Sequence, residues 1–260
     1  MNRVPLFGMH IDRVELDEAA TTLLTWARGP KEPICRYVVT PNVDHTVLLS
    51  HHQPLQQAYR EAAMVVADGA PLVAASRLLG RPLPGRVAGS DLVPRLLELA
   101  GATSTADAGQ PLRVFLLGAG PGVAERAAHR IHLRYDGVKV VGVHSPPLGF
   151  ETDELANAEA LRRVVATAPD LLIVGLGAPK QELWVHQHAD RLNAKVAICA
   201  GATIDFLAGE KQRSPLWMQR SGLEWLHRLI SEPRRLAKRY LRDAIIFPRL
   251  VWNEWWTTAR

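Results

Sequence analysis

An acidic residue follows a short apolar run at two places in the chain. Asp68 comes directly after residues 63–67, and Asp205 comes directly after residues 200–204. A carboxylate at the end of a buried strand can act as a general base that takes a proton from an attacking hydroxyl. The same position also suits the N-terminus of a following helix. For each of the two residues, both interpretations stay open.

Two neutral hydrogen-bonding residues, Thr40 and Asn42, flank Pro41 at the end of another apolar run. Their side chains could position a substrate hydroxyl beside a base at the same edge of a sheet. Otherwise they are turn residues next to a proline. With Asp68, they form the candidate catalytic set.

Three glycines, Gly118, Gly120 and Gly122, follow an apolar run and precede a helical pattern. Backbone amides at a helix N-terminus favour phosphate. The spacing departs from the dinucleotide-binding fingerprint, because Pro121 interrupts it and no ribose-binding acid follows at the expected distance. The segment is therefore a candidate substrate-binding loop, with a tight strand-to-helix turn as the alternative.

A second glycine-containing segment ends in Lys180, Gln181 and Glu182, shortly after Gly177. Pro179 suits the first turn of a helix. Lys180 could meet a phosphate, and Gln181 could bond a sugar or a base. Two glycines and three polar residues exceed what helix capping requires, so we favour a substrate-binding role over a solvated helix end.

These segments need a scaffold that brings strand ends together. Unalternating apolar runs separated by helical patterns predict strands that are buried on both faces. Strand–helix alternation indicates an α/β fold with a Rossmann-like, mostly parallel sheet flanked by helices. Ligands bind beyond the carboxyl ends of such strands. The predicted strands lie within residues 33–40, 63–67, 114–117, 139–143, 171–174 and 196–199, and residues 43–62 are predicted to be helical.

Composition divides the chain into a core and a tail. Residues 211–260 hold 11 Lys/Arg against 4 Asp/Glu and five of the seven tryptophans. We expect residues 1–210 to form the α/β core and residues 211–260 to form a helical appendage. Small polar residues at 101–110 predict a surface loop, so a boundary between two lobes of the core could lie near 101–111.

The tail has the composition of a segment that meets anionic lipid or phosphate. From Pro233 onward a helix is predicted, with Arg235, Arg239 and Arg242 on one face and an end or kink at Pro248. No nucleic-acid motif accompanies the charge. The chain has no signal-peptide core and no apolar run of about 18 residues. We therefore expect a cytoplasmic protein, peripheral on the inner face of the cell membrane.

Metal and redox chemistry find little support in the sequence. The ten histidines form no H-E-x-x-H pattern, and no Asp-x-Asp motif occurs. Cys35 and Cys199 lie in apolar runs without metal-ligand spacing. We expect no bound metal and no cofactor.

The polar segments form an ordered series with a small number of further short motifs. They are Thr40-Pro41-Asn42, Ala67-Asp68-Gly69, Gly85 to Asp91, Leu116 to Gly118, Pro121 to Ala124, Gly175 to Glu182, Asp205 to Gly209, Arg213-Ser214-Pro215 with Trp217, Gly222 to Leu229, and Glu232-Pro233 with Arg235. In this order they resemble the WecG/TagA/CpsF glycosyltransferases, glycosyltransferase family 26, from about Thr40 to Leu241.

The resemblance implies an inverting, metal-independent transfer from a UDP-sugar to a polyprenyl-diphosphate-linked glycan acceptor in cell-surface polysaccharide synthesis. N-acetylmannosamine, its uronate and glucose are the candidate sugars. By resemblance, Asp68 is the general base, Thr40 and Asn42 contact the acceptor or sugar, and Gln181 contacts the donor. The resemblance also implies that the tail docks on the membrane and meets diphosphate through Arg213, Arg228 and Arg235.

Two other function classes stay open at this point. A nucleotide-dependent oxidoreductase would use the Gly118 loop, although its spacing fails the fingerprint. A non-catalytic membrane- or nucleic-acid-binding module would use the basic tail, but it leaves Asp68 and Lys180 unexplained. Flavin or nicotinamide absorbance would favour the first, and tail-dependent binding without turnover the second.

Overall fold

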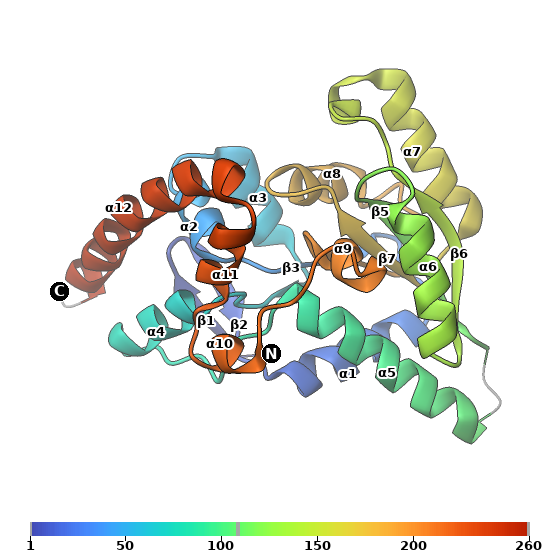
Figure 1. The fold of residues 1–260 in the computed structure, drawn as a ribbon, viewed down its shortest axis with the longest axis horizontal. Helices are drawn as coiled ribbons and strands as arrows, with labels where there is room; N and C mark the ends of the chain where they lie inside the picture. The colour runs from blue at the N-terminus through green and yellow to red at the C-terminus, as the bar shows by residue number, and fades with distance from the viewer. Residues whose placement is uncertain (1, 108–109, 259–260) are drawn as a thin grey trace.

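The protein, described here as a computed structural model for residues 2–107 and 110–258, is built on one six-stranded parallel sheet. Its strand order is β4-β3-β8-β7-β5-β6, and every neighbouring pair is parallel. The predicted α/β class is confirmed (Figure 1). The strands are β3 (Arg36–Val39), β4 (Met64–Val65), β5 (Leu112–Gly118), β6 (Val138–His144), β7 (Leu171–Gly175) and β8 (Val196–Cys199).

Helices cover both faces of the sheet, which explains the unbroken apolar runs of the central strands. Residues 171–174 and 196–199 have no exposed surface. One hydrophobic core packs beneath α1 (Leu16–Arg28), α5 (Gly89–Asp107), α6 (Val123–Arg134) and α9 (Thr203–Ala208). The other packs beneath α2 (Val43–Leu49), α3 (Gln53–Glu61), α4 (Ala70–Leu78), α7 (Glu154–Thr167) and α8 (Lys180–His188).

An N-terminal hairpin, β1 (Arg3–Leu6) and β2 (Met9–Asp12), closes the β4 edge. The Asp12 carboxylate accepts a 3.0 Å bond from Arg3 Nε and a 2.9 Å bond from the backbone N–H of Val65. The buried carboxylate thereby occupies the open side of the edge strand, where backbone groups would otherwise lack partners.

Two sequence-based expectations about helices are wrong. The loop expected at residues 101–110 is helical as far as Asp107, and residues 108–109 lie outside the described part of the chain. Gly101 lies inside this helix, where a Cβ would come within 2.6 Å of the Asp136 carbonyl oxygen, so the close packing there requires glycine. The helical stretch expected at residues 43–62 is two helices, and the imidazole of His52 caps the second by accepting from Leu55 N–H.

The tail forms α10 (Leu216–Arg220), α11 (Glu224–Ser231) and α12 (Pro233–Thr258), which lie over α2 and α4 (Figure 1). The expected start at Pro233 is confirmed, but Pro248 does not end the helix. Phe247 and Val251 pack on the core beneath it and hold the helix on both sides of the proline. In the part of the chain that the structure describes, no helix is both long and apolar enough to span a bilayer.

Candidate active site

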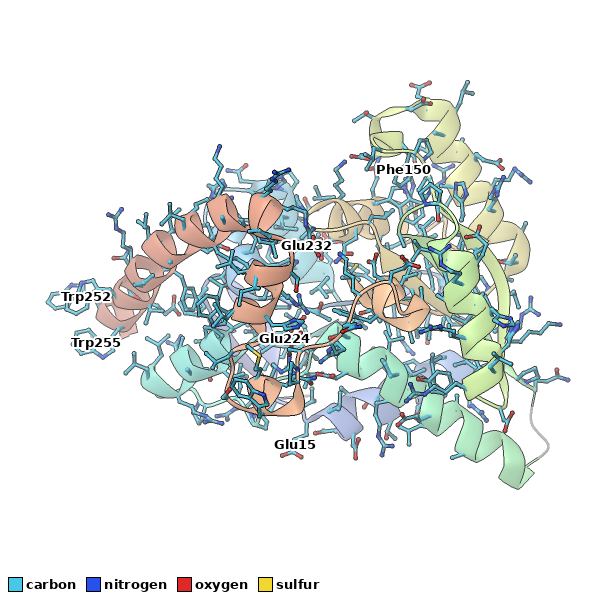
Figure 2. All side chains as sticks on the ribbon, in the orientation of Figure 1. Glu15, Phe150, Glu224, Glu232, Trp252 and Trp255 are labelled. Atoms are coloured by element: carbon cyan, nitrogen blue, oxygen red, sulfur yellow. The ribbon has the colours of Figure 1, made fainter. Side chains whose placement is uncertain are left out.

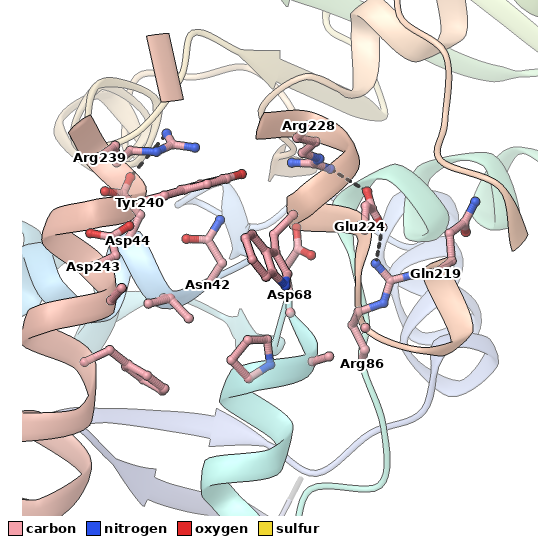
Figure 3. A pocket seen from close by; sticks show the side chains of 18 of the residues that line it. Asn42, Asp44, Asp68, Arg86, Gln219, Glu224, Arg228, Arg239, Tyr240 and Asp243 are labelled. Atoms are coloured by element: carbon pink, nitrogen blue, oxygen red, sulfur yellow. Dashed lines mark hydrogen bonds and ion pairs between the residues drawn. The ribbon is translucent and has the colours of Figure 1, made fainter. Parts of the chain in front are cut away.

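A pocket of about 310 Å³ opens beyond the carboxyl ends of β3 and β4, between the core and the tail (Figure 3). The core contributes the segments that follow these two strands together with Arg86, and the tail contributes residues from Gln219 to Pro248. Core and tail residues therefore share one cavity. Its polar lining residues are Asn42, Asp44, Asp68, Arg86, Gln219, Glu224, Arg228, Arg239, Tyr240 and Asp243.

Asp68 lies in the wall of this pocket, three residues after β4 ends. Its backbone N–H donates a 2.7 Å bond to the Pro41 carbonyl, which ties it to the segment after β3. Gly69 follows with a φ of +145°, a conformation open chiefly to glycine. Burial raises the pKa of the Asp68 carboxyl, while the guanidinium groups of Arg228 and Arg86 oppose that rise. A carboxyl with a raised pKa suits proton abstraction near neutral pH.

Charged side chains join the two halves of the pocket beside Asp68. Arg86 of the core bonds Glu224 of α11 and Asp91 of α5, both over 2.8 Å. Arg228 bonds the same Glu224 over 2.7 Å, and Arg213 bonds Asp91 over 2.8 Å. Burial disfavours charge on Glu224, but Arg228, Arg213 and Arg86 hold its pKa below the ordinary value.

The other two candidate catalytic residues differ in position. Asn42 lines the pocket, while its Oδ1 caps α2 by accepting from the His45 backbone N–H. Thr40 is buried and donates a 3.0 Å bond to the Cys199 carbonyl, which ties β3 to β8. The structure therefore brings Asn42 to Asp68 and leaves Thr40 behind the pocket wall.

The Lys180–Glu182 segment forms the start of α8 and does not line this pocket. Gln181 is buried and accepts a 3.1 Å bond from the Gly201 backbone N–H. Glu182 has no exposed surface, whereas Lys180 is exposed and pairs with Glu151.

The glycine-rich loop lies at the carboxyl end of β5, beside that of β7. A Cβ on Gly118 would lie 2.4 Å from the Gly175 carbonyl oxygen, so the close approach of the two strands requires glycine. Ser145 Oγ donates to the Gly118 carbonyl over 3.1 Å. Gly120, Gly122, Gly177 and Asp205 lie at this same edge of the sheet, and none of them lines the Asp68 pocket.

The sequence analysis predicted a basic helix face formed by Arg235, Arg239 and Arg242, but in the structure each of these arginines forms an ion pair with a carboxylate. Arg228 lines the pocket, and Arg213 joins its charge network. Arg235 is mostly exposed and pairs with Glu232. Arg239 and Arg242 both form ion pairs with Asp44 of α2, so they hold the tail on the core.

Several residues of the pocket carried no role in the sequence analysis. Arg86 lines the pocket and pairs with Asp91, and both lay within the motif Gly85 to Asp91, which was the available signal. Glu224 lay within the quoted motif Gly222 to Leu229 without an assigned role, whereas Tyr240 lay in none of the motifs. The packing of the tail on the core brings both residues into the pocket of Asp68. Within residues 2–107 and 110–258, no group of three or more His, Cys, Asp or Glu residues is placed to hold a metal ion.

The chain is similar over most of its length to known glycosyltransferases. The chain is 29% identical over 236 residues to the N-acetylglucosaminyldiphosphoundecaprenol N-acetyl-beta-D-mannosaminyltransferases of Staphylococcus aureus strains MRSA252 and MW2. In each case the match covers 91% of this chain and 87% of the relative. The oxidoreductase and binding-module alternatives gain no support from these matches. Residues 4–260 match the family described as Glycosyl transferase WecG/TagA/CpsF, and the chain belongs to this glycosyltransferase family.

Proposed function

We propose that this glycosyltransferase moves a sugar from a UDP-sugar to a polyprenyl-diphosphate-linked acceptor at a membrane surface, with inversion and without a metal ion. The observation that carries the proposal is the position of Asp68 in a pocket that the core and the arginine-bearing tail build together. The relatives are named for a diphosphoundecaprenol-linked N-acetylglucosamine acceptor and for the N-acetylmannosaminyl group that they transfer. N-acetylmannosamine is therefore the first donor sugar to test, before its uronate and glucose.

The proposed reaction is a single displacement. The acceptor hydroxyl gives its proton to Asp68 as its oxygen forms a bond to the anomeric carbon. The bond from that carbon to the UDP oxygen breaks, and UDP leaves with the electron pair. General-base catalysis of this kind contributes about 10²–10⁴ in rate. One displacement inverts the anomeric configuration.

Negative charge on the substrates needs positive partners in a site that lacks a metal ion. Arg86 and Arg228 line the pocket beside Asp68 and can bond phosphate oxygens through planar guanidinium groups. We assign them to the acceptor diphosphate, with Arg213 supporting both through Asp91 and Glu224. Arg235 is exposed enough to meet a phosphate outside the pocket.

We assign the donor nucleotide to the edge formed by β5 and β7. The loop of Gly118, Gly120 and Gly122 opens at the N-terminus of α6, where backbone amides favour phosphate. Lys180 and Asp205 lie at the same edge and could bond phosphate and ribose. Gln181 and Glu182 are buried, so they support this edge from within.

The outward side of α12 fits a membrane surface. Figure 2 shows Trp252 and Trp255 projecting from the far end of this helix. Amphipathic rings at exposed positions suit the lipid headgroup layer. The exposed apolar residues on α12 are Leu241, Ile245, Trp252, Trp255 and Trp256.

The direct test is UDP release from a panel of UDP-sugars with a polyprenyl-diphosphate-linked N-acetylglucosamine acceptor, with and without EDTA. We expect acceptor-dependent, EDTA-resistant release by the wild type and its loss in Asp68→Asn. Asp190→Asn, at an exposed position, is the matched control. Anomeric coupling in the product checks inversion. The proposal fails if UDP does not bind, or if release persists undiminished in Asp68→Asn.

A further inference from the structure

A chain of buried polar groups runs from α8 to the wall of the pocket. Gln181 Nε2 donates to Glu182 Oε1 over 2.8 Å, and His45 Nε2 lies 3.2 Å from the same oxygen. On the opposite side of the imidazole ring, His45 Nδ1 lies 2.9 Å from Asn42 Oδ1. Asn42 points into the pocket near Asp68 (Figure 3). A carboxylate deep in the core is therefore connected to an amide in the pocket.

Both ionisable members of this chain are buried, Glu182 with 0% and His45 with 6% of its surface exposed. Glu182 Oε2 is buried and has no hydrogen-bond partner. An isolated buried carboxylate is costly unless a positive charge lies beside it. The cap of α2 is reciprocal: Asn42 Oδ1 accepts the His45 backbone N–H, and the Asn42 backbone N–H lies 3.4 Å from His45 Nδ1, farther than the 2.9 Å that separates this nitrogen from Asn42 Oδ1. The cap does not involve His45 Nε2, so it does not explain the carboxylate there. A role in keeping a proton on His45 does explain it.

The surroundings of His45 favour the charged ring. Burial opposes the charge, but the hydrogen bond and charge of Glu182, with the charges of Asp44 and Asp68, raise the pKa of His45. Tyr59 of α3 packs its ring 6.4 Å from the imidazole. The groups that face His45 thus come from α2, α3, α8 and the segment after β4, and Asp44 is itself paired with Arg239 and Arg242 of α12.

A charged imidazole fixes the direction of the Asn42 amide. With a proton on each nitrogen, His45 donates to Glu182 and to Asn42 Oδ1 together. The same Oδ1 also accepts the backbone N–H of His45 over 3.3 Å. The oxygen is therefore held toward α2, and the NH₂ group is left for the pocket. Loss of the Nδ1 proton would set a nitrogen lone pair against Oδ1 and release the amide.

We propose that His45 and Glu182 are positioning residues that hold the Asn42 amide with its NH₂ group toward the pocket, where it donates a hydrogen bond to a hydroxyl or carbonyl oxygen of the sugar bound beside Asp68. This rests on the proposed function, because it takes the pocket to be the site of transfer. It assigns the transfer reaction two residues that never touch the substrate.

The pH dependence of kcat distinguishes this role from a purely structural one. The charged form of His45 exists below its pKa, so activity falls as the pH rises through that pKa. In Glu182→Gln we expect this alkaline limb to move down by about 1–3 pH units, because an adjacent opposite charge is removed. At neutral pH, kcat should fall about 10–100-fold from misplacement of the amide. Glu159→Gln on the exposed face of α7 is the matched control. An unmoved alkaline limb in a folded Glu182→Gln overturns the proposal.

A double-mutant cycle shows whether Glu182 acts through Asn42. Asn42→Ala and Glu182→Gln should each lower kcat, and the double variant should lose little beyond Asn42→Ala alone. Fully additive losses would contradict the proposal. Melting temperatures of all three variants identify any loss that comes from unfolding.

The protonation of His45 can be measured in the wild-type chain without any variant in the assay. Imidazole ¹⁵N shifts, assigned against His45→Gln, should show both nitrogens protonated at pH 7. A neutral His45 at pH 7 overturns the proposal. Absence of transfer by the wild type with every donor would instead defeat the proposed function and leave this shift measurement unaffected.

Discussion

The carboxyl edge of the sheet is built in one way beyond β3 and β4 and in another beyond β5 and β7. At the β3–β4 edge, the pocket holds Asp68 among charged side chains that come from both the core and the tail. At the β5–β7 edge, the Gly118 loop brings the backbones of the two strand ends close together. Strand β8 lies between the two edges in the sheet. The first edge suits proton transfer and charge neutralisation, and the second suits close approach of a phosphate to backbone amides.

Under the proposed function, acceptor chemistry takes place at the β3–β4 edge and the donor binds at the β5–β7 edge. Gln181 and Glu182 lie between the two regions, because one bonds Gly201 beyond β8 and the other bonds His45 behind the pocket. Substitutions at the first edge should change kcat, and substitutions at the second should change donor affinity. The predictions below test that separation.

The largest effect is expected from Asp68→Asn. An amide cannot take the acceptor proton, so kcat should fall about 10²–10⁴-fold while UDP affinity stays within twofold. Single-turnover transfer and calorimetric UDP binding measure the two quantities separately. A parallel loss of UDP affinity would break the division between the edges.

Arg228→Ala removes a pocket cation. Charge-assisted bonds to phosphate contribute about 1.5–3 kcal/mol, so kcat/KM for the acceptor should fall about 10–100-fold. Arg234→Ala, at an exposed position on α12, is the control for loss of a tail charge. Steady-state kinetics with varied acceptor check this, and an equal loss in both variants would indicate a general charge effect.

Replacing Trp252, Trp255 and Trp256 by alanine removes exposed aromatic surface far from Asp68. We expect binding to vesicles that contain anionic lipid to weaken about tenfold, because apolar and aromatic area no longer enters the interface. Transfer to a short-chain, water-soluble acceptor should be unchanged. Vesicle co-sedimentation and the soluble assay together check this, and a loss of soluble activity would place these residues in the site instead.

The smallest effect is expected from Lys180→Ala. This exposed ammonium already pairs with Glu151, so its loss should weaken UDP binding about threefold and leave kcat unchanged. Lys195→Ala, whose partner is Asp170 at the opposite end of the strands, is the matched control. Titration calorimetry with UDP distinguishes the two variants.

The sequence predicted the features that depend on local pattern. The run at residues 196–199 coincides with β8, and the run at 171–174 lies within β7, because strands buried on both faces leave an unbroken apolar signal. Asp68 was recognisable because it follows such a run. Gly101 suggested a break in α5, but it is glycine because its backbone packs closely against Asp136, a contact that no local pattern encodes.

The tail shows why part of the site could not be predicted. Arg239 and Arg242 share a helical face, as expected. Both form ion pairs with Asp44, which lies nearly 200 residues earlier in the sequence. Glu224 gains its role only where α11 meets Arg86. Long-range pairing of charges leaves no periodicity in the sequence, so it becomes visible only in the folded chain.

The most direct test of a shared core–tail site is the acid limb of the pH profile of kcat/KM. As the proposed general base, Asp68 would act when deprotonated, so we expect activity to fall as the pH drops through its raised pKa, which Arg228 and Arg86 hold down. Loss of Arg228 should move the acid limb of the full-length protein to higher pH, whereas Lys180→Ala should leave it in place. An acid limb that stays unmoved in Arg228→Ala would contradict the account, because the tail would then not act on the base.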